Sequence, residues 1–169
     1  MNRIIKSTSQ TKDSQVITAL SSLFALELFN PSRELFLYSP WITDVILINN
    51  HHGQFRAILP EFEYQRISLS SILNTLSNRG TKIHLLMRPE LSSYTKEFFG
   101  RLSNEIQFKL IPNLHEKILL TETFFFRGSM NFTYSGIYLN DEHTEITTDP
   151  QLIAQAITEA KHRWRESIR

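Results

Sequence analysis

The chain has 169 residues, a formal net charge of +1, 41% hydrophobic residues and no cysteine. This length suits one globular domain with its own hydrophobic core, and we expect residues 1–169 to form a single domain. The near-neutral charge excludes binding to nucleic acid through overall charge, so any basic binding surface has to be local. Without cysteine, the chain has neither disulfides nor thiolate metal sites.

The N-terminal stretch MNRIIKSTSQTKDSQ lacks the apolar core of a signal peptide. The longest apolar stretch, VITALSSLFALELF, is too short and too polar to span a bilayer. We therefore expect a cytoplasmic protein that does not act at a membrane.

Hydrophobic spacing and turn residues predict alternating helices and strands along the chain. Helices are expected at residues 14–29, 68–80, 91–103 and 150–167, and strands at 34–40, 81–88, 105–112, 117–122, 123–129 and 142–149. Residues 41–66 combine apolar segments with an Asn/His/Gly turn and a proline, and we interpret them as a long excursion that contains a hairpin. The alternation predicts an α/β fold with a mixed β-sheet flanked by helices.

The residues with the clearest chemical potential begin at His115. His115 and Lys117 stand two positions apart in HEKILLTE, and residues with this spacing on a strand project from the same face. Gly128 and Ser129 end the next predicted strand, where a small residue permits close approach of a ligand. Asn131 begins the turn or helix that follows, where hydrogen-bond donors can converge on an anion.

These residue types suit phosphoryl transfer. Lys117 supplies a positive charge, and Ser129 and Asn131 supply neutral donors to the phosphate oxygens. A neutral His115 can act as a nucleophile or a base. Its second ring nitrogen needs an acceptor that fixes the tautomer, and Glu142 is the candidate for that role.

The pattern H-x-K-x4-E, followed by G-S-x-N-F-T and a downstream N-x-E, resembles the HKD motif of the phospholipase D superfamily. It is most similar to the short bacterial nuclease branch, and the similarity is clearest over residues 114–147. The resemblance implies a phospholipase D-like fold and a phosphohistidine formed at His115. It also implies phosphate binding by Lys117, Ser129 and Asn131, an orienting role for Glu142, and no metal or other cofactor.

Two features of the motif need further interpretation. The aspartate of the family motif is replaced by Glu122, at a position that the resemblance identifies as supporting, as is Gly128. The chain also has a single H-x-K pattern, because no lysine follows His51 at the required offset. Short members of the family complete their site by dimerising, so the resemblance implies a homodimer with a composite active site. The second His115 would then act as the general acid.

The resemblance leads us to expect a metal-independent phosphodiesterase, a nuclease that acts on DNA. The chain also resembles phospholipase D-like proteins of bacterial DNA-modification and restriction clusters, which implies phage defence and partner subunits of a defence system. One alternative is a DNA-binding or assembly subunit that is inactive or weakly active. Another is a lipid-hydrolysing enzyme, for which an exposed apolar surface would be expected.

Several residues outside the motif are further candidates. Trp41, after Pro40, is either a base-stacking residue or a hydrophobic plug at the sheet edge. Three arginines are candidates for contact with phosphate: Arg56, Arg88 and Arg127. The adjacent pair His51 and His52 is interpreted as part of a turn, because a metal site needs three or four converging ligands.

Overall fold

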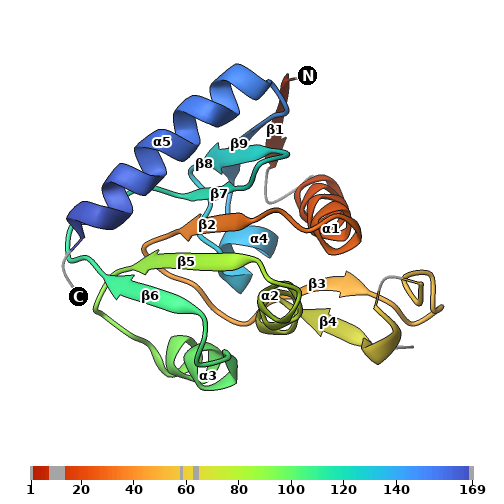
Figure 1. Ribbon diagram of the computed structural model, residues 1–169. Helices are drawn as coiled ribbons and strands as arrows, with labels where there is room; N and C mark the ends of the chain where they lie inside the picture. Colours follow the sequence, from red (N-terminus) through yellow and green to blue (C-terminus); the bar gives the residue numbers. More distant parts are fainter. Residues whose placement is uncertain (1, 8–13, 58, 63–64, 168–169) are drawn as a thin grey trace.

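The computed structural model describes residues 2–7, 14–57, 59–62 and 65–167 (Figure 1). A seven-stranded sheet has the order β1-β9-β8-β7-β2-β5-β6, and β3 and β4 form a separate two-stranded sheet. The strands are β1 (Asn2–Ser7), β2 (Glu34–Tyr38), β3 (Ile46–Asn49), β4 (Arg66–Ser68), β5 (Lys82–Met87), β6 (Gln107–Leu110), β7 (Ile118–Leu120), β8 (Phe125–Gly128) and β9 (Glu142–Thr147). β2, β5 and β6 run parallel and the other pairings are antiparallel, which confirms the predicted mixed sheet.

Helices cover both faces of the large sheet (Figure 1). The helices are α1 (Ser14–Phe29), α2 (Leu69–Asn78), α3 (Ser93–Arg101), α4 (Tyr134–Tyr138) and α5 (Pro150–Glu166), with a short 3-10 helix at Pro60–Phe62. α5 packs its Ile153, Ala156 and Ala160 against one face, and the hydroxyl of Tyr38 donates to the carbonyl of Ala160 at 2.9 Å. The other helices bury their apolar residues in the larger core cluster on the opposite face. No helix in the described part of the chain is long and apolar enough to cross a membrane.

Most predicted elements are present, with strand ends a few residues shorter than expected. The excursion at 41–66 contains β3 and leads into β4, and the antiparallel pairing of these two strands confirms the predicted hairpin. β1 and the 3-10 helix at Pro60–Phe62 were not predicted, and α4 follows the turn or helix that was expected to begin at Asn131. β1 has only two apolar residues, Ile4 and Ile5, among its six, and it pairs antiparallel with β9, a strand far away in the sequence. α4 has only five residues, too few for a helical pattern in the sequence.

The pairing register brings five strand ends to one edge of the sheet. Tyr38, the last residue of β2, pairs with Ile118, the first residue of β7. Ile118 also pairs with Arg127 near the end of β8, and Gly128 pairs with Thr144 near the start of β9. β5 runs parallel to β2 and therefore ends at the same edge. The loops that leave these ends carry the predicted site residues.

Candidate active site

His115 and Lys117 lie in the segment that leads into β7. The predicted strand start was wrong, because β7 begins at Ile118 and both residues precede it. Side-chain hydrogen bonds occupy the backbone of His115. The ammonium group of Lys117 donates to the carbonyl of His115 at 2.9 Å, and the backbone N–H of His115 donates to the carboxylate of Glu116 at 3.4 Å. The buried Leu114 anchors the segment, while the imidazole of His115 is exposed at the sheet edge.

Ser129 and Glu142 are in direct contact. The hydroxyl of Ser129 donates to the Glu142 carboxylate, and the amide of Asn140 donates to the other carboxylate oxygen at 3.4 Å. The backbone of Ser129 is held by β9, because its N–H donates to the carbonyl of His143 at 2.9 Å. The contact therefore joins the end of β8 to the start of β9.

Gly128 has a packing role that the sequence did not indicate. A Cβ atom at this position would lie 2.1 Å from the carbonyl oxygen of His143. The missing side chain therefore makes room for the backbone of β9. This close approach is enough to explain a glycine here without a ligand. Its N–H donates to the carbonyl of Lys117 at 3.2 Å, which ties the end of β8 to the lysine of the motif.

Asn131 is held by a residue that the sequence did not single out. Its Oδ1 lies 3.3 Å from the hydroxyl of Ser39, which is fully buried and also lies 2.9 Å from the carbonyl of Trp41. The same hydroxyl accepts from the backbone N–H of Phe132 at 3.3 Å. With Oδ1 turned toward Ser39, the NH₂ group of Asn131 is left as a donor. The sequence feature that could have pointed to Ser39 is its position between a buried strand and Pro40.

Arg88, in the loop after β5, adjoins the imidazole of His115. Its Nη2 lies 3.1 Å from Nδ1 and 3.3 Å from Nε2 of the ring. Its Nε donates to the carbonyl of Leu114 at 2.9 Å, and its Cζ lies 5.1 Å from the ring centroid of Trp41. Arg88 is thus in contact with the histidine and lies near Trp41. Of the three candidate arginines, Arg88 is at the site, whereas Arg127 pairs with Glu145 at 2.8 Å.

A comparison with protein families identifies this arrangement. The family model described as cardiolipin synthase, phospholipase D-like domain matches residues 45–164, well over half of the chain. The chain belongs to the phospholipase D-like family. This confirms the superfamily that the H-x-K and G-S-x-N patterns predicted. No curated protein sequence matches the chain significantly.

Several solved structures share the fold of this chain. Nuc, a phospholipase D family member from Salmonella typhimurium, is 14% identical with a TM-score of 0.63, and the match covers 99% of this chain and 97% of Nuc. NucT from Helicobacter pylori is 14% identical with a TM-score of 0.61 and coverage of 99% and 96%. Polyphosphate kinase from Porphyromonas gingivalis is 10% identical with a TM-score of 0.66, where all of this chain covers 26% of the kinase. At these identities the likeness shows the fold alone.

Glu122, which replaces the motif aspartate of phospholipase D-like proteins, lies beyond the far end of β7 from His115. Its carboxylate accepts from Nε of Arg33 at 3.0 Å and from the backbone N–H of Arg33 at 3.3 Å. Arg33 immediately precedes β2. Glu122 therefore links the end of β7 to the start of β2, at a distance from the histidine.

The remaining candidates lie in the β3–β4 excursion. Nε2 of His51 accepts from Nε of Arg66 at 3.3 Å, and Arg56 lies in the turn between the two strands. Within the described residues, no three His, Asp or Glu side chains come together in an arrangement that could hold a metal ion. The excursion thus has its own side-chain contacts, apart from the residues around His115.

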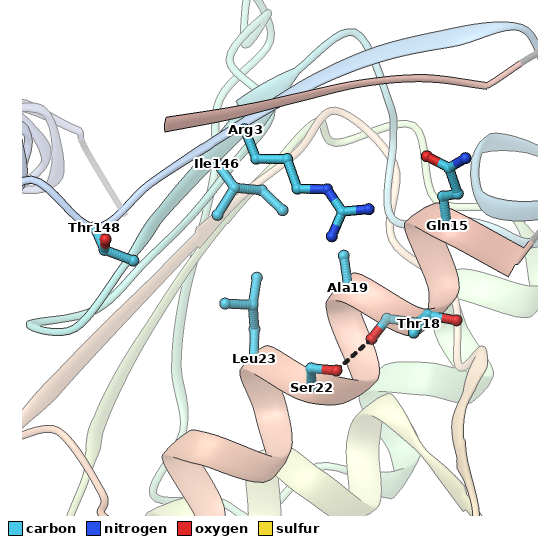
Figure 2. Close-up of a pocket in the computed structure, with 8 residues that line it drawn as sticks. All are labelled: Arg3, Gln15, Thr18, Ala19, Ser22, Leu23, Ile146 and Thr148. Carbon is cyan, nitrogen blue, oxygen red and sulfur yellow. Dashed lines mark hydrogen bonds between the residues drawn. The ribbon is translucent and has the colours of Figure 1, made fainter. Parts of the chain in front are cut away.

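A separate hollow lies between α1 and the β1–β9 pair (Figure 2). Its lining residues are Arg3, Gln15, Thr18, Ala19, Ser22, Leu23, Ile146 and Thr148. Figure 2 shows Arg3 extending from β1 toward α1, and the hydroxyl of Ser22 donating to the carbonyl of Thr18 at 2.7 Å. Among these eight residues there is no histidine, carboxylate or lysine. The hollow therefore lacks the acid–base groups that gather at the strand-end edge.

Proposed function

We propose that this phospholipase D-like chain is a metal-independent phosphodiesterase that cleaves nucleic acid, DNA above all, through a phosphohistidine at His115. The observation that carries the proposal is the convergence of the H-x-K segment, the G-S-x-N segment and the start of β9 on one sheet edge. The contacts between Lys117 and Gly128, and between Ser129 and Glu142, join these three segments.

The proposed reaction has two displacements at phosphorus. A ring nitrogen of His115 attacks the phosphorus, a P–N bond forms, and the bond from phosphorus to the leaving oxygen breaks. Lys117, Ser129 and the amide of Asn131 stabilise the charge on the other phosphate oxygens. Glu142 accepts a hydrogen bond from the attacking imidazole and orients it.

Protonation of the leaving oxygen needs a second acid. We assign this role to the His115 of a second copy, which a two-fold axis through the site edge would bring opposite the first. Water then attacks the phosphohistidine, its proton passes to the second histidine, and the P–N bond breaks. The active unit in this proposal is a homodimer with one composite site.

The direct test compares purified wild type and His115→Ala in excess EDTA on single- and double-stranded DNA. The proposal expects cleavage by the wild type that survives chelation and falls to background in the variant. Cleavage that stops with EDTA, or that persists in His115→Ala, would contradict it.

The composite site has its own test. Wild type and His115→Ala are mixed, dissociated and reassociated at a series of ratios. A composite site loses activity in every mixed dimer, so activity should fall with the square of the wild-type fraction. A linear fall would mean that each copy works alone, and sedimentation would report the state of the chain directly.

A DNA-binding or assembly subunit without turnover is the second candidate. Arg88 favours it, because its guanidinium lies at hydrogen-bond distance from the nitrogen that would attack. Glu122 in place of aspartate favours it too. This candidate predicts equal DNA affinity and no cleavage for both wild type and His115→Ala.

We also propose that the chain works with other subunits of a restriction or phage-defence system, as the motif resemblance implies. Such an enzyme should cleave modified and unmodified DNA at different rates when its partners are present. Equal rates on the two substrates, with and without candidate partners, would remove this part of the proposal.

A further inference from the structure

A second cavity, of about 550 Å³, lies beside the candidate active site, between α3, α4 and the segment after β2. Its lining residues are Thr43, Asp44, Val45, Ile46, Tyr94, Glu97, Arg101, Thr133, Tyr134 and Ser135. Two of them are large exposed aromatic residues, Tyr94 at 70% and Tyr134 at 60% exposure. Isolated exposed aromatics are common, but two on one cavity form a surface that suits a planar ligand.

Three chain segments connect this cavity to the site around His115. The segment after β2 passes from Ser39 and Trp41 to Thr43, and the loop after β5 passes from Arg88 to Tyr94. The segment after β8 passes from Asn131 to Thr133.

The first and third of these segments are also joined to each other. The N–H of Thr43 donates to the carbonyl of Phe132 at 2.9 Å, and Ile42 and Phe132 form a β-bridge. The cavity is therefore a continuation of the site edge rather than an unrelated hollow.

The charges in the cavity disfavour a phosphate. Asp44 and Glu97 both pair with Arg101, Asp44 at 2.9 Å, so two carboxylates share one guanidinium. Asp44 also accepts from the N–H and the hydroxyl of Ser70, both at 2.9 Å. A phosphate would meet a net negative lining. An uncharged ring with N–H donors on its edge would meet carboxylate and hydroxyl acceptors and two exposed aromatic rings in the same lining.

Tyr134 is well held for a stacking role. Its ring centroid lies 4.9 Å from that of Tyr138, and the hydroxyl of Tyr138 donates to the carbonyl of Ile46 at 2.9 Å. Tyr138 therefore fixes one side of Tyr134, while most of Tyr134 stays exposed. A ring that is already held in place loses little conformational entropy when a ligand stacks on it.

We propose that this cavity is a nucleobase subsite, which takes an unpaired base of a single-stranded nucleic acid whose neighbouring phosphate lies at His115. The proposal rests on the proposed nuclease function and deepens it by naming the substrate class. Tyr94 and Tyr134 stack on the base, and the acceptors of Glu97, Thr133 and Ser135 face its edge. A base in a duplex cannot enter, since its faces are covered by the neighbouring base pairs.

The test measures binding rather than cleavage, so that it stands apart from the test of the nuclease. His115→Ala is used as the background, with a fluorescein-labelled single-stranded DNA octamer and the matching duplex as probes. Tyr94→Ala and Tyr134→Ala are added singly. Phe29→Ala is the matched control, because Phe29 is 75% exposed at the end of α1 and does not line the cavity.

We expect each tyrosine variant to weaken octamer binding by about fivefold to a hundredfold, the range for loss of one stacked base. Phe29→Ala should bind like the background. The duplex should bind more weakly than the octamer in the background protein, and this difference should shrink in the tyrosine variants. A series of octamers is then tested, each with a single abasic site at a different position. The abasic site should weaken binding at one or two positions, and that effect should disappear in Tyr134→Ala.

Each other result would overturn the proposal. Equal octamer affinity in the tyrosine variants and in Phe29→Ala would remove the stacking role. Duplex affinity equal to octamer affinity would remove the single-strand preference. A change of sedimentation in the tyrosine variants, with the abasic effect retained, would make the cavity an interface between copies. DNA cleavage without these binding effects would leave the nuclease intact and remove only the subsite.

Discussion

The guanidinium of Arg88 lies against the imidazole of His115, with Nη2 3.1 Å from Nδ1. Nη2 also lies 3.3 Å from Nε2, and because a guanidinium only donates, it can bond only to the ring nitrogen that carries no proton. Its Nε is held by the carbonyl of Leu114 and its plane lies near Trp41. Arg88 thus places a positive charge next to the proposed nucleophile. When a substrate binds, its guanidinium can exchange the contact with the imidazole for a contact with the substrate phosphate.

Arg88→Ala tests this role. The loss of one charge-assisted contact with the phosphate, worth about 1.5–3 kcal/mol, should lower kcat/KM by roughly tenfold to a hundredfold. Arg88→Lys should recover only part of the loss, because lysine lacks the planar fork that binds two oxygens at once. The measurement is steady-state hydrolysis of a phosphodiester by the three proteins. Arg165→Ala, at the end of α5, is the control for lost positive charge.

The opposite result would also be informative. Faster hydrolysis by Arg88→Ala would mean that the arginine covers the histidine instead of binding substrate. That outcome would favour the subunit without turnover as the native role of the chain.

Ser39 offers a second test, of positioning. Ser39→Ala leaves the buried N–H of Phe132 without its hydroxyl acceptor and removes the partner of Asn131. We expect a loss of about 1–3 kcal/mol in the free energy of unfolding, measured in urea, together with a lower kcat. If Ser39 acts through Asn131, the effect on kcat should vanish in an Asn131→Ala background. Equal effects in both backgrounds would make Ser39 purely structural. Ser22→Ala on α1 is the matched serine control.

Gly128 and Gly100 form a matched pair of glycines. Gly128→Ala would place its Cβ 2.1 Å from the carbonyl of His143, so β8 and β9 must separate. We expect a loss of about 1–3 kcal/mol or more, with reduced activity because Ser129 moves with the strand end. A Cβ at Gly100 meets nothing within 4 Å, so Gly100→Ala in α3 should be neutral or stabilising by up to about 1 kcal/mol. Equal thermal midpoints for the two variants would contradict this account.

The sequence was sufficient where the information is local. α1 and α5 follow from apolar spacing within one helix, and the H-x-K and G-S-x-N patterns identify the family from short segments. Ser39 and Arg88 could not be placed in this way. Ser39 meets Asn131 across 92 positions of the chain, and Arg88 meets His115 across 27. Such contacts depend on the order of the strands in the sheet. That order is set by pairing between strands far apart in the sequence, so a local pattern does not reveal it.

The misplaced start of β7 has a related cause. Alternation of side chains predicted that His115 and Lys117 lie on the strand, but the Lys117 ammonium and the Glu116 carboxylate take hydrogen-bonding groups of the His115 backbone. Charged side chains of this kind compete with strand pairing in ways that a periodic pattern does not record.

His84 gives a prediction for stability against pH. It lies under α5, with its ring centroid 4.8 Å from those of Phe36 and Trp164, and Nε2 is 3.4 Å from Glu34. Burial lowers the pKa of His84 below its usual 6.5, and the charges of Lys161 and Lys82 add to this, while Glu34 opposes them. The unfolded chain therefore binds a proton more readily than the folded one.

It follows that the contribution of His84 to the free energy of unfolding is fully present above pH 6.5. This contribution is lost as the pH falls from 6.5 through the lower pKa of the folded state. Burial raises the pKa of Glu34, but the hydrogen bond and charge of Lys161 outweigh it, so the net pKa lies below the usual 4.5 and its effect falls in more acidic solution. We expect the free energy of unfolding to drop between neutral pH and pH 5, and the drop to shrink in His84→Gln. His162→Gln, on the exposed side of α5, should keep the wild-type slope. Urea unfolding at steps of pH measures all three, and an unchanged slope in His84→Gln would assign the pH dependence to other groups.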